Sequence, residues 1–212
     1  MNTVTVIETR MKRKGRVKVF LDRGFAFSLS LAVAAEAGLH KGQTLSLPEI
    51  ERLKSADRLH RSLNSALRYM SPRPRSEAEI RARLNRHGFD ADIIEQVLTK
   101  LKEQGLVDDI AFARFWRENR ENFRPLSRRL MELELKQKGV DAEAIAEATA
   151  GVDDELAAYQ AAQRKARSVE GLDYSSLRKR LGAFLKRRGF GYELINRTID
   201  RVWQERDNAQ QN

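Results

Sequence analysis

Alternating charged and apolar residues mark the N-terminal part of the chain as β structure. Arg16–Leu21 alternates at a period of two, which is typical of a half-buried strand. Phe25–Leu29 alternates in the same way, and Val4, Val6 and Ile7 form an earlier apolar run. These three segments predict a β-hairpin or a three-stranded meander.

The turns of this segment and the helices after it are also readable. Lys14–Gly15 and Asp22–Gly24 are typical turn sequences between the strands. A short helix over Leu31–Ala37 should end at Gly38, because glycine adopts the positive φ of a helix C-terminus. From Leu47 onward, apolar residues recur at helical spacing, so the rest of the chain is predicted to be helical.

An internal repeat lies within the helical part of the chain. Gly88, Gly139 and Gly189 follow one another at intervals of 51 and 50 residues, and apolar residues recur at fixed distances from each glycine. The matching residues are Ile80, Met131 and Leu181 at −8; Leu84, Leu135 and Leu185 at −4; Phe89, Val140 and Phe190 at +1; Ile94, Ile145 and Ile195 at +6; and Leu101, Val152 and Val202 at +13.

Two helices that meet at a glycine explain this pattern. The first helix would end with a positive φ at the glycine, and the second would begin at Asp90, Asp141 or Gly191, where aspartate is a good N-cap. A base stands just before each glycine, and a third helix precedes each pair. The bases are Arg86, Lys138 and Arg188, and the third helices run over about 56–70, 108–122 and 153–169.

The chain is therefore predicted to be mainly α, with tandem three-helix repeats in an elongated array behind a small N-terminal β segment. The predicted division is 1–54 for the β-rich extension with its short helix, 55–105, 106–151 and 152–206 for the three repeats, and 207–212 for a disordered tail.

Composition excludes several classes of chemistry. The 212 residues include no cysteine, which removes disulfides, thiolate metal sites and cysteine nucleophiles, and the three histidines are scattered. No Ser–His–Asp set, phosphate-binding glycine loop or secretory signal occurs. We therefore expect a cytoplasmic protein that is not an enzyme, with no cofactor, no metal and no membrane partner, and a monomer.

Positive charge is unevenly distributed. The net charge of +10 divides into +5 for residues 1–54, +3 for 55–105, −4 for 106–155 and +6 for 156–212. Leu177–Arg188 holds six bases and no acid, and its apolar residues would share one helix face. Lys179, Arg180, Lys186 and Arg187 would then form an outward cationic ridge suited to a polyanion.

Two other features have ordinary structural explanations. Asp108 and Asp109 could be a carboxylate pair for metal chemistry, but the start of a predicted helix explains them as a cap. Trp116 and Trp203 fall on apolar stripes and are expected in the core. A metal-dependent nuclease using the two aspartates remains an alternative that Mg²⁺-dependent cleavage would reveal.

A set of motifs resembles a known family. The stretch from Ala66 to Phe89, ALRYMSPRPRSEAEIRARLNRHGF, resembles the opening repeat of the RecX proteins, bacterial modulators of the RecA recombinase. Further matches follow in order over roughly residues 55–206. They are GLVDD at 105–109 with Phe112-Ala113, FRP at 123–125, LELKQKG at 133–139 and FLKRRGF at 184–190.

The resemblance implies a function without catalysis. It implies a regulator of DNA recombination, DNA repair and the SOS response, which lies in the groove of the RecA–single-stranded-DNA filament and inhibits or modulates strand exchange and ATP hydrolysis. Single-stranded DNA alone would be a weaker, salt-sensitive partner. The matched bases expected to bind are Arg75, Arg81, Arg83, Arg124, Arg128, Arg129, Lys186, Arg187 and Arg188, while Lys179 and Arg180 rest on the charge argument alone.

A sequence-specific DNA-binding regulator is the alternative function. Helix pairs that meet at a glycine superficially resemble helix-turn-helix units. The second helices, however, begin with Asp90-Ala91-Asp92, Asp141-Ala142-Glu143 and Gly191-Tyr192-Glu193, and acidic residues approach a duplex poorly.

Overall fold

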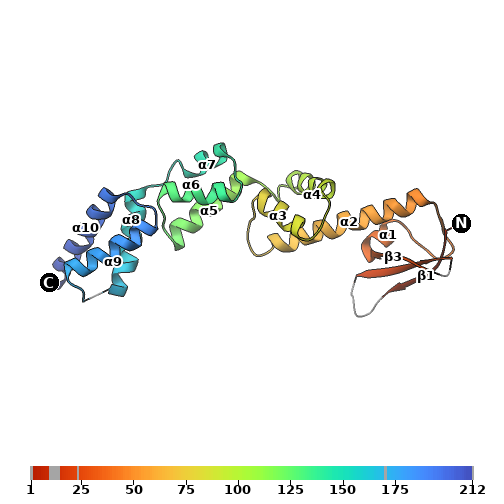
Figure 1. Ribbon diagram of the computed structural model, residues 1–212, viewed down its shortest axis with the longest axis horizontal. Coiled ribbons are helices and arrows are strands. Elements are labelled where there is room, and N and C mark those ends of the chain that lie inside the picture. The colour runs from red at the N-terminus through yellow and green to blue at the C-terminus, as the bar shows by residue number, and fades with distance from the viewer. Residues whose placement is uncertain (1, 10–14, 23, 170, 212) are drawn as a thin grey trace. The chain divides into compact units, whose positions relative to one another are not determined.

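The computed structural model describes residues 2–9, 15–22, 24–169 and 171–211 (Figure 1). The chain forms two compact units. One consists of Met1–Arg73 with Ile80–Leu106, and the other of Pro74–Glu79 with Val107–Asn212.

The first unit begins with an antiparallel sheet. Its strands are β1 (Asn2–Thr9), β2 (Arg16–Leu21), β3 (Gly24–Ser30) and β4 (Thr44–Leu45), in the order β3-β2-β1-β4. The predicted meander is confirmed, and β4 is an addition whose two residues show no alternation that could reveal it. Of the first predicted turn, Lys14 lies outside the described residues, while Gly15 has a φ of 94°.

Two helices cover one face of this sheet (Figure 1). The short helix α1 (Leu31–Glu36) ends before Gly38, as predicted, and α2 (Leu47–Met70) begins with a capping box between Ser46 and Glu49. Helix α2 continues without a break through Lys54 and Ser55, where the sequence suggested a division. The core between sheet and helices includes Val4, Val17, Val19, Leu29, Val33, Leu45 and Ile50.

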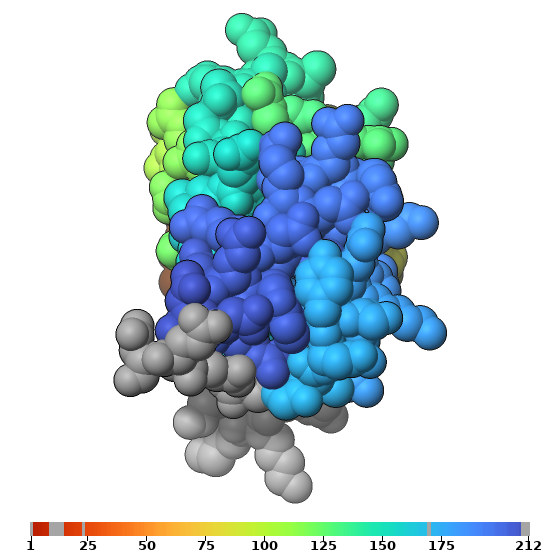
Figure 2. Space-filling model, turned by 90° about the vertical axis from the view of Figure 1, so that its left-hand side faces the viewer, coloured from red at the N-terminus to blue at the C-terminus, as the bar shows by residue number. Residues whose placement is uncertain are grey.

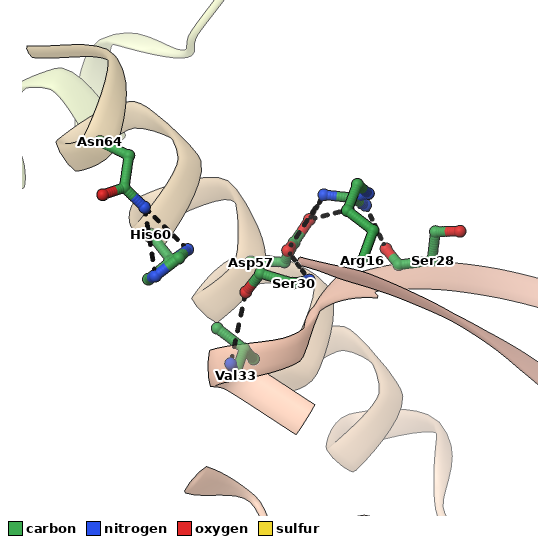
Figure 3. A network of polar contacts seen from close by, with 7 residues as sticks. All are labelled: Arg16, Ser28, Ser30, Val33, Asp57, His60 and Asn64. Atoms are coloured by element: carbon green, nitrogen blue, oxygen red, sulfur yellow. Dashed lines mark hydrogen bonds and ion pairs between the residues drawn. The ribbon is translucent and has the colours of Figure 1, made fainter. Parts of the chain in front are cut away.

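A buried carboxylate joins the sheet to α2 (Figure 3). Asp57 is only 4% exposed, and it accepts a 2.6 Å hydrogen bond from the backbone N–H of Ser30. The guanidinium of Arg16 on β2 lies 3.2 Å from the same carboxylate and also donates to the carbonyl of Ser28. Because a buried charge needs such partners, this network fixes the sheet against one face of α2.

The first unit continues with α3 (Glu77–Arg86) and α4 (Ala91–Glu103), although the first turn of α3 belongs to the second unit. Asp90 occupies the N-cap position of α4, but its side chain makes no capping hydrogen bond. Its carboxylate instead lies 3.1 Å from the guanidinium of Arg58. The predicted cap is therefore replaced here by an ion pair with α2.

The second unit contains two further groups of three helices. The first group is α5 (Asp109–Phe123), α6 (Arg128–Gln137) and α7 (Ala142–Thr149). The second is α8 (Asp154–Ala166), extended by the 3-10 turn η1 (Arg167–Val169), with α9 (Tyr174–Arg187) and α10 (Tyr192–Gln211). Within the described residues, no helix is long and apolar enough to cross a membrane.

The internal repeat is confirmed by backbone and burial alike. Gly88, Gly139 and Gly189 have φ values of 73°, 76° and 86°. In each copy the residue after the glycine donates its N–H to the carbonyl of the leucine four residues before the glycine, as in a Schellman motif. The leucines themselves, Leu84, Leu135 and Leu185, are fully buried. The predicted fold class, mainly α with tandem three-helix units and a small β segment, is therefore correct.

The C-terminal helix differs from the prediction. A disordered tail was expected from residue 207, yet α10 continues to Gln211. The sequence after Trp203 contains no glycine or proline to stop a helix, and Arg206 donates a 3.0 Å hydrogen bond to the carbonyl of Leu172. This contact anchors the last turns to the loop before α9.

The two helix groups of the second unit meet at a polar joint. The N–H of Ser127, the N-cap of α6, donates to the carbonyl of Arg188, and the Arg188 guanidinium donates to the carbonyl of Pro125 at 2.9 Å. The N–H of Arg128 donates to Asp154 at 2.7 Å. Arg188 at the end of α9 and Asp154 at the start of α8 thus pair with backbone groups at the start of α6 that have no partner within that helix.

The same joint recurs one repeat earlier within the second unit. Ser76, equivalent to Ser127, donates its hydroxyl to the carbonyl of Lys138 at 2.7 Å, and Lys138 pairs with Glu79 at 3.1 Å. The N–H of Glu77 donates to Asp109 at 2.9 Å. In both joints the base before the repeat glycine therefore contacts the start of a preceding helix: Lys138 contacts the first turn of α3, and Arg188 contacts the residues just before α6.

Candidate nucleic-acid interface

Helix α9 separates apolar and cationic residues onto opposite faces. Asp173 caps its N-terminus by accepting a 3.1 Å hydrogen bond from the N–H of Ser176, and hydrogen bonds to Ser176 lower the pKa of the Asp173 carboxyl. Leu177, Leu181 and Leu185 are buried against α8 and α10, which confirms their predicted face. Tyr174 and Phe184 are partly buried against the same core, while Arg178, Lys179, Arg180, Lys186 and Arg187 are exposed.

Four bases on this outer side form what we call the α9 cationic face: Lys179, Arg180, Lys186 and Arg187. All four are exposed, and none is in an ion pair with a described residue. Figure 2 turns the C-terminal helices toward the viewer, with long side chains projecting from their surface. A row of unpaired cations repels itself, and a polyanion would relieve that repulsion.

Two hollows adjoin along α9 and share Lys179 and Ala183 in their walls. The first, of about 460 Å³, lies between α9 and α10, and the second, of about 570 Å³, is lined by Lys165 of α8, Arg180 and Arg187 among others. No acidic residue is among the described residues that line either hollow. Both can therefore receive anionic groups without displacing a carboxylate.

Arg188 has a different environment from its neighbours on α9. It is half-buried, it donates to the carbonyl of Pro125, and its guanidinium lies 4.6 Å from the ring centre of Phe184. Burial, with the positive charges of Arg124, Arg164 and Arg120, lowers its pKa below the usual arginine value. The structure thus gives Arg188 a role in the joint between α6 and α9, apart from the α9 cationic face.

The candidate bases of the middle repeat lie near the start of α6. Arg124, Arg128 and Arg129 are all exposed. Arg128 pairs with Glu132 at 2.9 Å, as its spacing of four residues predicts. Arg124 ends α5 and contributes to the positive field around Arg188.

The candidate bases of the first repeat are partly engaged. Arg81 of α3 pairs with Glu95 of α4, and the Arg83 guanidinium lies 5.4 Å from the ring centre of Tyr69. Arg75 is half-buried next to Ser76. Arg81 and Arg83 contribute to the packing of α2, α3 and α4, so they are less available to a ligand than the α9 cationic face.

The carboxylates of Asp108 and Asp109 accept hydrogen bonds from backbone N–H groups. Asp108 caps α5 by accepting from the N–H groups of Ile110 and Ala111, and Asp109 accepts from the N–H of Glu77. Among the described residues, no three histidines or carboxylates gather as a metal site would require. The predicted capping role of Asp108 is confirmed.

Sequence reasoning missed three residues that the structure places beside the α9 cationic face. Lys165 reaches it from α8, Arg178 lies on its border, and Tyr192 of α10 stands 74% exposed at the rim of the first hollow. Their proximity depends on how three helices pack together. The sequence signal for this surface is the acid-free run 177–188, and of these three residues only Arg178 lies within that run.

Four family models match the chain along its length. They are the RecX N-terminal domain at residues 2–46 and the first, second and third three-helix domains of RecX at 63–101, 108–148 and 153–199. Two curated relatives, both named regulatory protein RecX, are similar in sequence. The relative from Lactobacillus gasseri is 31% identical over 100% of this chain and 79% of its own length, and that from Lactobacillus johnsonii is 33% identical over 95% and 75%.

Solved structures show the same fold. A crystal structure of regulatory protein RecX matches with a TM-score of 0.65 and 25% identity, covering 94% of this chain and all of the solved one. The crystal structure of RecX from Lactobacillus salivarius matches with a TM-score of 0.57 and 23% identity, over 69% and 97% of the two chains.

Proposed function

Because the chain belongs to the RecX family of regulatory proteins, we propose that it is a non-enzymatic, cytoplasmic regulator of RecA that binds the RecA–single-stranded-DNA filament and inhibits or modulates its strand exchange and ATP hydrolysis. In this proposal the protein takes part in recombination, DNA repair and the SOS response through its partner, and it acts as a monomer without a cofactor.

The exposed α9 cationic face is the observation that carries the binding part of the proposal. Its four bases have no described carboxylate partner, and they border two hollows with acid-free walls. Cations held in this way attract a phosphate backbone at long range and contact it at short range. The repeated three-helix units support the proposal further, because similar units can contact successive protomers of a regular filament.

The test is the ATPase rate of RecA on single-stranded DNA, measured with and without the protein. We expect inhibition that a variant with Lys179, Lys186 and Arg187 changed to glutamate loses, because charge reversal repels the phosphates. Arg188 stays unchanged, since its contact with Pro125 makes it part of the fold.

The outcomes separate the function from the surface. A RecA ATPase rate that the wild-type protein leaves unchanged would overturn the proposed function. Full inhibition by the charge-reversed variant would remove the α9 cationic face from the mechanism. A circular dichroism spectrum and melting temperature equal to wild type are required of the variant before either result is interpreted.

A further inference from the structure

The hollow between α9 and α10 has an apolar floor. Gly182 and Ala183 of α9 and Ile195 and Ile199 of α10 line it. A Cβ atom on Gly182 would lie 3.8 Å from Cδ1 of Ile199, in ordinary van der Waals contact, so even an alanine side chain here would cover part of the floor. Its volume of about 460 Å³ is within the range of about 300–1,000 Å³ found for small-molecule pockets.

The rim of this hollow combines cations with one aromatic ring. Arg178, Lys179 and Lys186 stand around it, and Tyr192 is 74% exposed at its edge. Arg178 donates a 3.4 Å hydrogen bond to Asn196, and hydrogen bonding to Asn196, together with the charge of Arg178, lowers the pKa of Tyr192. Tyr192 thus shares the lining of the hollow with Asn196 and Arg178, while much of its ring faces solvent.

The order of these groups along the helix indicates the occupant. Lys179 and Lys186 are seven residues apart, about 10 Å along the axis of α9, and the small residues Gly182 and Ala183 lie between them. The surface thus presents cation, flat apolar floor and cation in sequence. A nucleic-acid strand presents the complementary order of phosphate, base and phosphate, and exposed aromatic rings commonly stack on unpaired bases.

We propose that this hollow is a base-binding slot, in which one unstacked base of single-stranded DNA lies on the apolar floor against Tyr192 while Lys179 and Lys186 contact the flanking phosphates. The inference rests on the proposed function, which it deepens by assigning the part of the chain that contacts DNA bases. Because stacking tolerates every base, the slot selects single-stranded over duplex DNA without reading sequence.

The experiment compares two strands of equal charge. Fluorescence anisotropy measures the binding of the full-length chain to a labelled 15-nucleotide oligothymidine and to a 15-unit strand whose sugars all lack bases. We expect the wild-type protein to bind oligothymidine about tenfold more tightly, since one stacked base contributes on that order. Tyr192→Ala removes the stacking ring, and Gly182→Leu fills the slot. Both should reduce the ratio to about one while leaving the affinity for the abasic strand within about twofold.

A matched control uses Phe123, which is 77% exposed but outside the slot. Phe123→Ala should keep the tenfold preference for oligothymidine. This result would show that losing an exposed aromatic ring elsewhere does not abolish the preference. Tyr192→Phe should keep it as well, because the ring remains. If either slot variant fails to fold by circular dichroism, the other still tests the proposal.

Three results would overturn the slot. The first is a wild-type ratio of oligothymidine affinity to abasic-strand affinity near one, and the second is a ratio that neither slot variant changes. The third is that an acidic peptide with an apolar residue displaces bound oligothymidine while unlabelled oligothymidine does not. The last result would assign the hollow to a protein partner. Inhibition of RecA, measured separately, distinguishes failure of the slot from failure of the proposed function. Inhibition without base preference removes the slot alone, while base preference without any effect on RecA removes the proposed function alone.

Discussion

At the scale of single residues, the three repeat glycines have different surroundings despite a shared conformation. A Cβ on Gly88 would meet nothing within 4 Å, whereas a Cβ on Gly189 would collide with the Ser127 side chain and lie 2.8 Å from Cβ of Leu130. Gly88→Ala should therefore cost only the strain of positive φ, about 1 kcal/mol of unfolding free energy. Gly189→Ala adds overpacking at the joint and should cost about 3 kcal/mol.

Urea unfolding followed by circular dichroism measures both changes. Equal losses for the two variants would contradict the tight joint at Gly189. Gly189 could be identified from the sequence as a repeat glycine, because its neighbours at −4 and −8 lie on the same helix. Its close packing at the joint could not be identified from the sequence, because Ser127 and Leu130 contact it from about 60 residues earlier in the chain.

Asp57 provides a second prediction at this scale. Asp57→Ala leaves the N–H of Ser30 and the guanidinium of Arg16 without their carboxylate. The free energy of unfolding should fall by about 2 kcal/mol, less than for a fully buried pair because the Arg16 side chain is 31% exposed. Glu51→Ala is the matched control on the same helix, since its carboxylate pairs with Lys54 in solvent and should contribute less than about 0.5 kcal/mol. Similar losses for both would contradict a structural role of the buried network.

At the scale of elements, α8 and α10 are joined by a hydrogen bond that depends on pH. The hydroxyl of Tyr159 donates to Glu205 at 2.6 Å, and this bond lowers the pKa of Glu205 and raises that of Tyr159. A carboxyl with a lowered pKa stabilises the fold above its unfolded value of 4.5, and the stabilisation is lost as pH falls through the folded value. A tyrosine with a raised pKa stabilises below 10.0, and the stabilisation is lost as pH rises through the folded value.

Tyr159→Phe tests this link by removing the donor. The melting temperature of the variant should lie below that of the wild type at pH 7, and the difference should shrink as the pH falls below 4.5. Tyr174→Phe serves as the comparison, because its hydroxyl bonds Asp200 on α10 from α9. A difference between wild type and Tyr159→Phe that is constant from pH 7 to pH 3 would exclude the Glu205 carboxylate as its cause.

Elements were predictable from the sequence where their cause is local. The strand alternation of Arg16–Leu21, the leucine stripe of α9 and the glycine turns all depend on residues within one or two turns of each other. Pairings between distant segments were not predictable. The two-residue strand β4 exists only because β1 lies beside it, and Arg188, which the resemblance placed among the binding bases, donates a hydrogen bond to the carbonyl of Pro125. Periodicity contains no information about such partners.

At the scale of the whole molecule, the placement of positive charge matters more than its sum. The protein carries a net charge of +10, but many bases of the second unit are neutralised by carboxylates, such as Arg114 by Glu147, Arg197 by Glu155 and Arg201 by Glu205. The α9 cationic face has no such described partners. A nucleic acid should therefore distinguish two variants with the same net charge.

The salt dependence of single-stranded DNA binding measures this distinction. Each phosphate contact contributes about −0.7 to the slope of log affinity against log salt concentration. Replacing Lys179, Lys186 and Arg187 by alanine should make the slope shallower by about 2, because three contacts are lost. Replacing Arg114, Arg197 and Arg201 by alanine removes the same number of positive charges but should change the slope by less than about 0.7. If both triple variants lost the same slope, the net charge alone would govern binding, and the α9 cationic face would have no special role.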